Sequence, residues 1–207
     1  MRSEPVGRAG SRSFTETARR EQLTWAAVRT VNELGYHRAS LAEIAKRADI
    51  AKSAVVYYFS SKETLLLEVV RSAFAALGEE VLAAVRDADG TAARLRAYAD
   101  AYLGHVDAHR AAIAAAVEIA VSHRTADGRP LYLVENDEDT ALLRDILARG
   151  IDDGTFRPMP LDVAVGLAES VLDRSITVVQ RDPHADLGEL RGHAVPFLFR
   201  ALGAADA

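Results

Sequence analysis

Residues 40–63 read SLAEIAKRADIAKSAVVYYFSSKE and carry the start signals of two helices. Ser40 with Glu43, and Ser60 with Glu63, have the spacing of a capping box, in which paired side chains satisfy free backbone N–H groups. Helices are therefore expected to begin near residues 41 and 61. Between these starts, LAEIAKRA predicts a helix of two turns, DIA predicts a turn, and KSAVVYYF predicts a second short helix.

Apolar residues predict how these helices pack. One side of each short helix is expected to face a core, through Leu41, Ile44, Ala45 and Ala48 in the first and Ile50, Val55 and Phe59 in the second. Upstream, Leu23, Ala26, Ala27 and Val31 form the apolar face of a helix expected over residues 15–34, which ends at Gly35. The two short helices and their turn form a helix-turn-helix, a motif that reads DNA.

The outward side of the second short helix carries small and polar side chains. Small residues at its amino end allow the helix to enter a major groove, while tyrosine hydroxyl and lysine ammonium groups donate hydrogen bonds to phosphates. The residues expected to contact DNA are Ser40, Lys52, Ser53, Ala54, Tyr57, Tyr58 and Lys62.

Charge is unevenly distributed along the 207 residues, whose formal net charge is -5. Residues 1–62 contain 11 Lys/Arg and 6 Asp/Glu, whereas residues 63–207 contain 14 and 24. A basic surface at one end of an acidic chain indicates a polyanion partner for that end, since phosphate binding depends on the local field. Chance clustering of charge on a solvated face is the alternative interpretation.

Composition excludes several classes of site. The chain has no cysteine, which excludes a thiolate nucleophile, a disulfide framework and a Cys-ligated zinc site. The N-terminus lacks the apolar core of a signal peptide, and no stretch reaches about 18 uninterrupted apolar residues. We therefore expect a cytoplasmic protein with no membrane association, and nothing in the sequence predicts a cofactor.

From Arg20 through Val70 the chain resembles the DNA-binding region of TetR-family transcriptional regulators. The resemblance lies in the run GY…AS…IA, in the spacing of the helix-turn-helix and in YYFSSKE…L. It implies an all-α protein whose three-helix DNA-binding domain covers residues 15–60. A disordered basic arm over residues 1–14 would precede this domain, and a larger helical domain for effector binding and dimerisation would follow it over residues 61–207.

The chain departs from the family pattern at three positions of the motif. Asp49 stands where glycine is usual in the turn, and aspartate tolerates the left-handed conformation better than most residues. Ala51 stands where a serine usually caps the recognition helix, and loss of a cap costs on the order of 1 kcal/mol. Val56 replaces a tyrosine that commonly precedes the aromatic pair, which removes one expected DNA contact.

The remaining sequence predicts long amphipathic helices over residues 62–87, 91–107, 109–123, 131–151, 160–181 and 186–202. The resemblance implies that the last two pair with their copies in a homodimer, as a four-helix bundle. Apolar stripes permit this, through Leu161, Val165, Ala168, Leu172 and Ile176 in one helix and Leu187, Leu190, Ala194, Phe197 and Leu198 in the other. Periodicity alone fits an intramolecular core at least as well.

An interior pocket for a small-molecule effector is expected in the second domain. The candidate lining residues are Phe74, Tyr98, Tyr102, Glu118, His123, Tyr132 and Asp173. His105 and His109 are four residues apart, a spacing that could offer two imidazoles to a metal. However, HVDAHR resembles a helix end with Asp107 as the next cap, which would separate the pair, so no metal site is expected.

The resemblance implies a ligand-responsive transcriptional regulator, a repressor that a small molecule releases from its operator. A constitutive DNA-binding protein without an effector is the first alternative. A helical hydrolase built from His123, Glu118 and a buried serine is the second. Because the sequence has no G-x-S-x-G, H-E-x-x-H or glycine-rich phosphate loop, we expect that the chain is not an enzyme.

Overall fold

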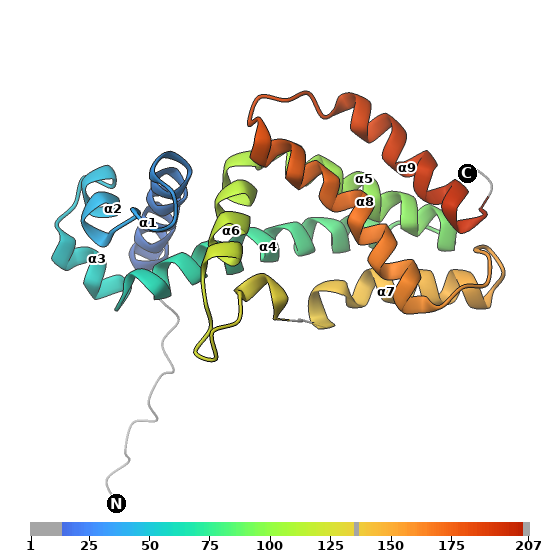
Figure 1. Ribbon diagram of the computed structural model, residues 1–207, viewed down its shortest axis with the longest axis horizontal. Coiled ribbons are helices and arrows are strands. Elements are labelled where there is room, and N and C mark those ends of the chain that lie inside the picture. The colour runs from blue at the N-terminus through green and yellow to red at the C-terminus, as the bar shows by residue number, and fades with distance from the viewer. Residues whose placement is uncertain (1–13, 135–136, 205–207) are drawn as a thin grey trace, which may run out of the picture.

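The computed structural model describes residues 14–134 and 137–204, so the expected basic arm lies almost wholly outside the described residues. These residues form α-helices and one short 3-10 helix (η1) (Figure 1). In chain order the elements are α1 (Phe14–Leu34), α2 (Leu41–Arg47), α3 (Lys52–Tyr58), α4 (Lys62–Arg86), α5 (Thr91–Ala108), α6 (Arg110–Ser122), η1 (Leu131–Leu133), α7 (Asp137–Asp152), α8 (Leu161–Arg181) and α9 (Gly188–Leu202).

The all-helical fold predicted from the sequence is confirmed. Figure 1 shows α1, α2 and α3 grouped at one end of an elongated molecule, here called the head. The other end, here called the body, contains α5, α7, α8 and α9. Helix α4 runs from the head along the body, and α6 crosses between them. None of the helices described has the length and apolar character needed to cross a bilayer.

The helix starts follow from capping residues. The Ser40 hydroxyl accepts a hydrogen bond from the Glu43 backbone N–H at 3.2 Å, as predicted. The prediction of Ser60 as the cap of the next helix is wrong by one residue. Helix α4 begins at Lys62, and Ser61 is its N-cap, accepting from the Thr64 N–H at 3.0 Å. Two adjacent serines gave equal local signals, and the turn after α3 places the second one at the helix end.

The turn between α2 and α3 depends on Asp49. This residue has a φ of 54°, in the left-handed region that few residues other than glycine, asparagine and aspartate adopt. Ala51 is the N-cap of α3 and its side chain makes no capping hydrogen bond. The turn is therefore retained without glycine, and the recognition helix lacks a side-chain cap.

Two clusters of buried side chains hold the molecule together. The head cluster contains Val55 and Phe59 of α3, both fully buried as expected, with apolar residues of α1, α2 and the first turns of α4. It also includes Ala115 and Ile119 of α6, so part of the head core comes from the helix that crosses between head and body. The body cluster contains the rest of α4 together with α5 to α9, and half-buried Val70 packs against both clusters.

Arg20 fixes α3 against α1. Its guanidinium lies 4.0 Å from the centroid of the Phe59 ring and donates to the Tyr58 carbonyl oxygen at 2.5 Å. A cation over an aromatic face contributes on the order of 1 kcal/mol, and the hydrogen bond satisfies a carbonyl at the end of α3. The last turn of α3 is thereby attached to the first helix of the head.

The body helices follow the predicted boundaries except in one region. The single helix expected over residues 131–151 is wrong: Leu131–Leu133 form η1, and α7 begins at Asp137. The chain turns back after α6, where Arg124 and Pro130 form an isolated bridge and the Leu131 N–H donates to the His123 carbonyl. Residue 131 is thus hydrogen-bonded to the end of α6, outside the register of α7.

The apolar stripes of α8 and α9 mostly face the interior of the chain itself. Val165, Ala168, Leu172 and Ile176 are buried, as are Leu187, Ala194 and Leu198, because α8 and α9 cover the body core. These residues are therefore unavailable for a dimer interface, which corrects the prediction made for them. The exposed apolar side chains of these helices are Val163, Leu167 and Phe197, which are 49%, 56% and 60% exposed.

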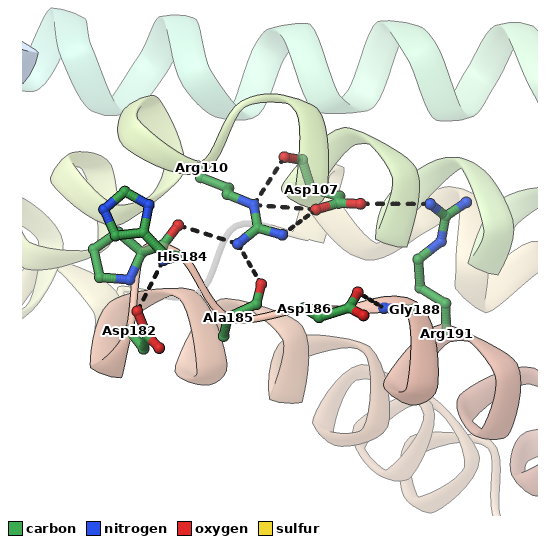
Figure 2. Close-up of polar contacts among 9 residues, drawn as sticks. Asp107, Arg110, Asp182, His184, Ala185, Asp186, Gly188 and Arg191 are labelled. Carbon is green, nitrogen blue, oxygen red and sulfur yellow. Dashed lines mark hydrogen bonds and ion pairs between the residues drawn. The ribbon is translucent and has the colours of Figure 1, made fainter.

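Charged side chains anchor the junction of α5 and α6 to the loop between α8 and α9 (Figure 2). Arg110 donates to the carbonyl oxygens of Pro183 and Ala185 at 3.1 and 2.5 Å. Asp107 accepts from Arg110 and lies 3.6 Å from Arg191. Residues 107–110 are therefore held in place by contacts with residues more than 70 positions later in the sequence.

Gly150 is required by packing in the body. A Cβ atom at this position would lie 2.0 Å from Cδ2 of Phe156, whose side chain is 1% exposed. We predict that Gly150→Ala lowers the free energy of unfolding by about 1–3 kcal/mol. Gly78, an exposed glycine in the middle of α4 with open space around it, is the matched control. Gly78→Ala should raise stability by about 0.5–1 kcal/mol in the same urea titration. Equal effects of the two changes would contradict this packing.

The missing cap of α3 gives a second prediction. Ala51 is exposed and has the extended backbone of an N-cap, so a serine hydroxyl there can accept from the first N–H groups of α3. Ala51→Ser should stabilise the protein by about 0.5–1 kcal/mol in urea unfolding. Ala42→Ser, at an exposed position inside α2, should give no increase. A lower stability for Ala51→Ser would show that α3 does not begin as described.

Candidate nucleic-acid interface

The outer face of α3 is accessible to a large partner. Lys52 and Ser53 are exposed in its first turn, Ala54 is half-buried, and Tyr57 is 81% exposed. Val55 and Phe59 on the opposite side of α3 point into the head core, which fixes the orientation of the helix. The Tyr57 ring packs edge to face against the Tyr58 ring, with centroids 5.0 Å apart. This contact restricts the direction in which the Tyr57 hydroxyl can point.

The other predicted DNA contacts lie at the edges of this face. Ser40 is exposed and caps α2, where its hydroxyl oxygen accepts a hydrogen bond. The hydroxyl hydrogen takes no part in this capping bond and can be donated to another group. Tyr58 is half-buried and packs against the head core, which makes it less accessible than Tyr57. Of the two tyrosines, Tyr57 therefore has the geometry of a phosphate donor.

Lys62 is attached to the head. Its ammonium donates to the carbonyl oxygens of Tyr36 and His37 at 2.6 and 3.2 Å, and burial lowers the pKa of the side chain. The same ammonium lies 4.8 Å from the centroid of the Tyr36 ring. An ammonium has three N–H donors, so one donor remains for a phosphate after the two carbonyls are satisfied. Contact with DNA by Lys62 stays a prediction, and its contact with the turn after α1 is the structural finding.

Two residues predicted to line an effector pocket instead lie where the head meets the body. The Glu118 carboxylate accepts from the Tyr36 backbone N–H at 2.6 Å, and His123 Nδ1 shares a hydrogen bond with the Tyr36 hydroxyl at 3.1 Å. His123 Nε2 lies 3.4 Å from Glu63 of α4. We call Tyr36, Lys62, Glu63, Glu118 and His123 the junction cluster. It borders an open groove of about 490 Å³ and connects α1, α4 and α6.

Gly35 allows the junction cluster to form. Its φ of 81° ends α1 in the left-handed conformation, and a Cβ at this position would lie 3.3 Å from the Glu118 carboxylate. The turn therefore brings the Tyr36 N–H directly to the carboxylate of α6. Burial raises the pKa of the Tyr36 phenol, so the hydroxyl remains protonated and available to His123 at neutral pH.

The remaining pocket candidates are in the body or on its surface. Tyr98 and Tyr102 are buried and stack with their ring centroids 6.4 Å apart, and the Tyr102 hydroxyl donates to Asp173 at 2.5 Å. Burial, followed by the Asp173 carboxylate, raises the pKa of the Tyr102 phenol. Phe74 is half-buried against the body core, whereas Tyr132 is 57% exposed on η1. The seven candidates thus do not line one common pocket.

The two histidines expected to be separated are brought together. Helix α5 continues through Asp107 to Ala108, so Asp107 is not a cap, and His109 connects α5 directly to α6. The imidazole centroids of His105 and His109 are 4.2 Å apart, and His105 Nδ1 lies 2.6 Å from the Glu80 carboxylate. Both histidines border a second groove, of about 400 Å³, that α1 and α4 also line. We call it the α1–α4 groove.

Three residues of these groups were not among the site residues predicted from the sequence. Tyr36 and Glu63 belong to the junction cluster, and Glu80 belongs to the histidine pair. Glu80 lies 25 positions before His105 and on a different helix, so sequence periodicity cannot show that the two side chains meet. Tyr36 belongs to the quoted family run, which was the only signal that could have marked it.

The head matches a known family. Residues 23–69 match the family described as bacterial regulatory proteins, tetR family. The chain is also 45% identical over 85 residues to the HTH-type transcriptional regulator BetI of Yersinia pestis (strain Pestoides F). That alignment covers 40% of this chain and 42% of the Yersinia protein, so the chain matches less than half the length of this relative.

The fold of the whole chain is also found in solved structures. The fatty acid degradation regulator FadR from Bacillus halodurans has a TM-score of 0.79 at 21% identity, covering 94% of this chain and 100% of that one. The transcriptional regulator FadR from Bacillus subtilis in complex with stearoyl-CoA has a TM-score of 0.74 at 19% identity, over 90% and 99% of the two chains. These proteins are described as regulators. The helix-turn-helix of this chain therefore matches the tetR family of bacterial regulatory proteins, and the chain has the fold of the two FadR structures.

Proposed function

We propose that the protein is a ligand-responsive transcriptional repressor that binds an operator through α3 of each subunit in a homodimer. The exposed outer face of α3 carries the proposal, because Lys52, Ser53 and Tyr57 are accessible while Val55 and Phe59 are fully buried. A short helix fixed in this way can enter a major groove, with its small residues toward the bases and its tyrosine toward a phosphate. Such a regulator acts on DNA in the cytoplasm.

Dimerisation is proposed from the solvent side of α8 and α9. A two-fold operator requires a two-fold protein, and these helices carry Val163, Leu167 and Phe197 as large exposed apolar side chains. Burying them in a second copy would remove apolar surface from water. Of the three residues of this proposed surface, Phe197 belongs to the stripes predicted from the sequence, whereas Val163 and Leu167 do not.

Effector control is proposed to act through α4 and α6. Helix α4 contributes to both buried clusters, and α6 places Ala115 and Ile119 in the head core. An effector that moves either helix would strain the junction cluster, where Glu118 and His123 contact Tyr36. The effector can shift the equilibrium away from the DNA-bound conformation only by the difference between its binding free energies for the two conformations. Because FadR of Bacillus subtilis was solved with stearoyl-CoA, that thioester is the first effector to test.

The test of the proposed function is fluorescence anisotropy of a labelled duplex taken from immediately upstream of the gene. It is titrated beside a scrambled duplex at several salt concentrations. We expect saturable binding of two subunits per duplex, preference for the upstream site, weakening as salt rises, and release by an effector. Equal binding to both duplexes would favour a constitutive DNA-binding protein. Absence of binding to either would contradict the proposal.

Tyr57 gives a prediction about phosphate contacts. Tyr57→Phe removes only the hydroxyl of a side chain that is 81% exposed, so folding should be unaffected. A hydrogen bond to a charged oxygen contributes about 1–2 kcal/mol, and affinity should fall roughly 5–30-fold for matched and scrambled duplexes alike. Tyr132→Phe, at an exposed tyrosine on η1, is the control and should bind normally. Unchanged affinity for Tyr57→Phe would remove this tyrosine from the interface.

The proposed dimer surface gives a prediction about oligomeric state. A carboxylate buried between two subunits is strongly unfavourable, so Leu167→Glu combined with Phe197→Glu should convert dimer to monomer in size-exclusion chromatography with light scattering. Leu82→Glu replaces a side chain that is 48% exposed on α4 and should leave the dimer intact. A dimer that persists in the double variant, or that Leu82→Glu disrupts equally, would place the interface elsewhere.

A further inference from the structure

We propose that Glu80, His105 and His109 bind one divalent transition-metal ion of the Zn²⁺ type. Each residue offers one ligand atom, and the three atoms all lie within 4.8 Å of one another. Glu80 belongs to α4, whereas the two histidines belong to the last turn of α5 and its junction with α6. The bound ion would therefore connect the helix that enters the head with two helices of the body.

The donor set has the chemistry of a zinc site. Two imidazole nitrogens and one carboxylate oxygen are ligands that Zn²⁺ accepts, and a fourth position can remain open to water. Metal–ligand bonds of about 2.1 Å with tetrahedral angles place neighbouring ligand atoms about 3.4 Å apart. Glu80 and His109 are exposed, so small rotations of their side chains are enough to bring the three atoms to that spacing.

The protein holds two of the ligands near the required arrangement. His105 is 3% exposed, and its Nδ1 lies 2.6 Å from the Glu80 carboxylate, in a hydrogen bond that the ion would replace with release of the shared proton. The His109 ring lies beside it, tilted by 32°, with a centroid distance of 4.2 Å. Asp107 and Arg110, which flank His109 in the sequence, make the polar contacts drawn in Figure 2. Ligands ordered by other contacts lose less conformational freedom when the ion binds.

The surroundings admit a cation. Both histidines border the α1–α4 groove of about 400 Å³, which gives an ion a route from solvent. Arg71, which also lines it, forms an ion pair with Glu68. Arg20 is held against the Phe59 ring and the Tyr58 carbonyl. Both guanidinium groups thus already have partners, and Glu21 also lines the groove.

The site goes beyond operator and effector binding, so it is tested without DNA. The untagged full chain is titrated with Zn²⁺ in competition with a chromogenic chelator, and with Co²⁺, whose absorption spectrum reports four-coordinate binding by imidazole. We expect one ion per chain and a thermal unfolding midpoint that rises with Zn²⁺ and not with Mg²⁺. His109→Ala and Glu80→Gln should each weaken Zn²⁺ binding at least ten-fold.

His184→Ala is the matched control, because His184 is an exposed histidine in the α8–α9 loop. This variant should bind Zn²⁺ as the parent protein does. Circular dichroism checks the fold of each variant. Because His109 and Glu80 are both exposed, loss of a ligand in these two variants can be distinguished from a general failure to fold. Binding that His109→Ala and Glu80→Gln leave unchanged, or that His184→Ala weakens equally, would overturn the proposal. Absence of Zn²⁺ binding to the parent would show that the three residues are only hydrogen-bonded neighbours.

Discussion

The constraint on which the rest of the structure depends is that head and body share two helices. The first half of α4 packs Leu65, Leu66 and Val69 into the head core, and its second half packs Leu77 and Val81 into the body core. Helix α6 contributes to both clusters along the same turns, with Ile113 and Ala116 in the body core and Ala115 and Ile119 in the head core. Because side chains in such cores are closely packed, the head cannot rotate freely on the body, and a displacement of either helix changes the position of α3.

Polar contacts also connect the head to the body. The junction cluster ties the turn after α1 to α6 through Glu118 and His123, and to α4 through Lys62. On the other side of α4, the α1–α4 groove brings residues of α1 next to His105 and His109. Effector control and the proposed metal site therefore use the same mechanical elements at two different places. The two proposals differ in their effect on the helices. The proposed effector control requires movement of α4 or α6, whereas the proposed metal ion would fix α4 to the end of α5.

Local signals in the sequence predicted most of the fold. Ser40, Gly35 and the apolar periods determine where helices begin and end, since capping and periodicity act over a few residues. Contacts between distant segments were beyond such signals: Lys62 reaches the carbonyl of Tyr36, and Glu80 reaches His105. Periodicity also identifies an apolar face without identifying what covers it. The family resemblance, and not the periodicity, led to the prediction that the stripe of α8 meets a second subunit, whereas α5 to α7 and α9 cover it within the same chain.

The measurement that tests the central claim most directly is selection of duplexes from a random DNA pool by the full-length protein, followed by sequencing. If α3 reads bases in each subunit of a two-fold dimer, the selected sequences contain an inverted repeat whose half-sites are separated by about one helical turn, or a multiple of it. Substitution of Ser53, exposed on α3, then changes the preferred half-site. A pool that remains random after repeated rounds, or that is enriched without symmetry, would contradict the account.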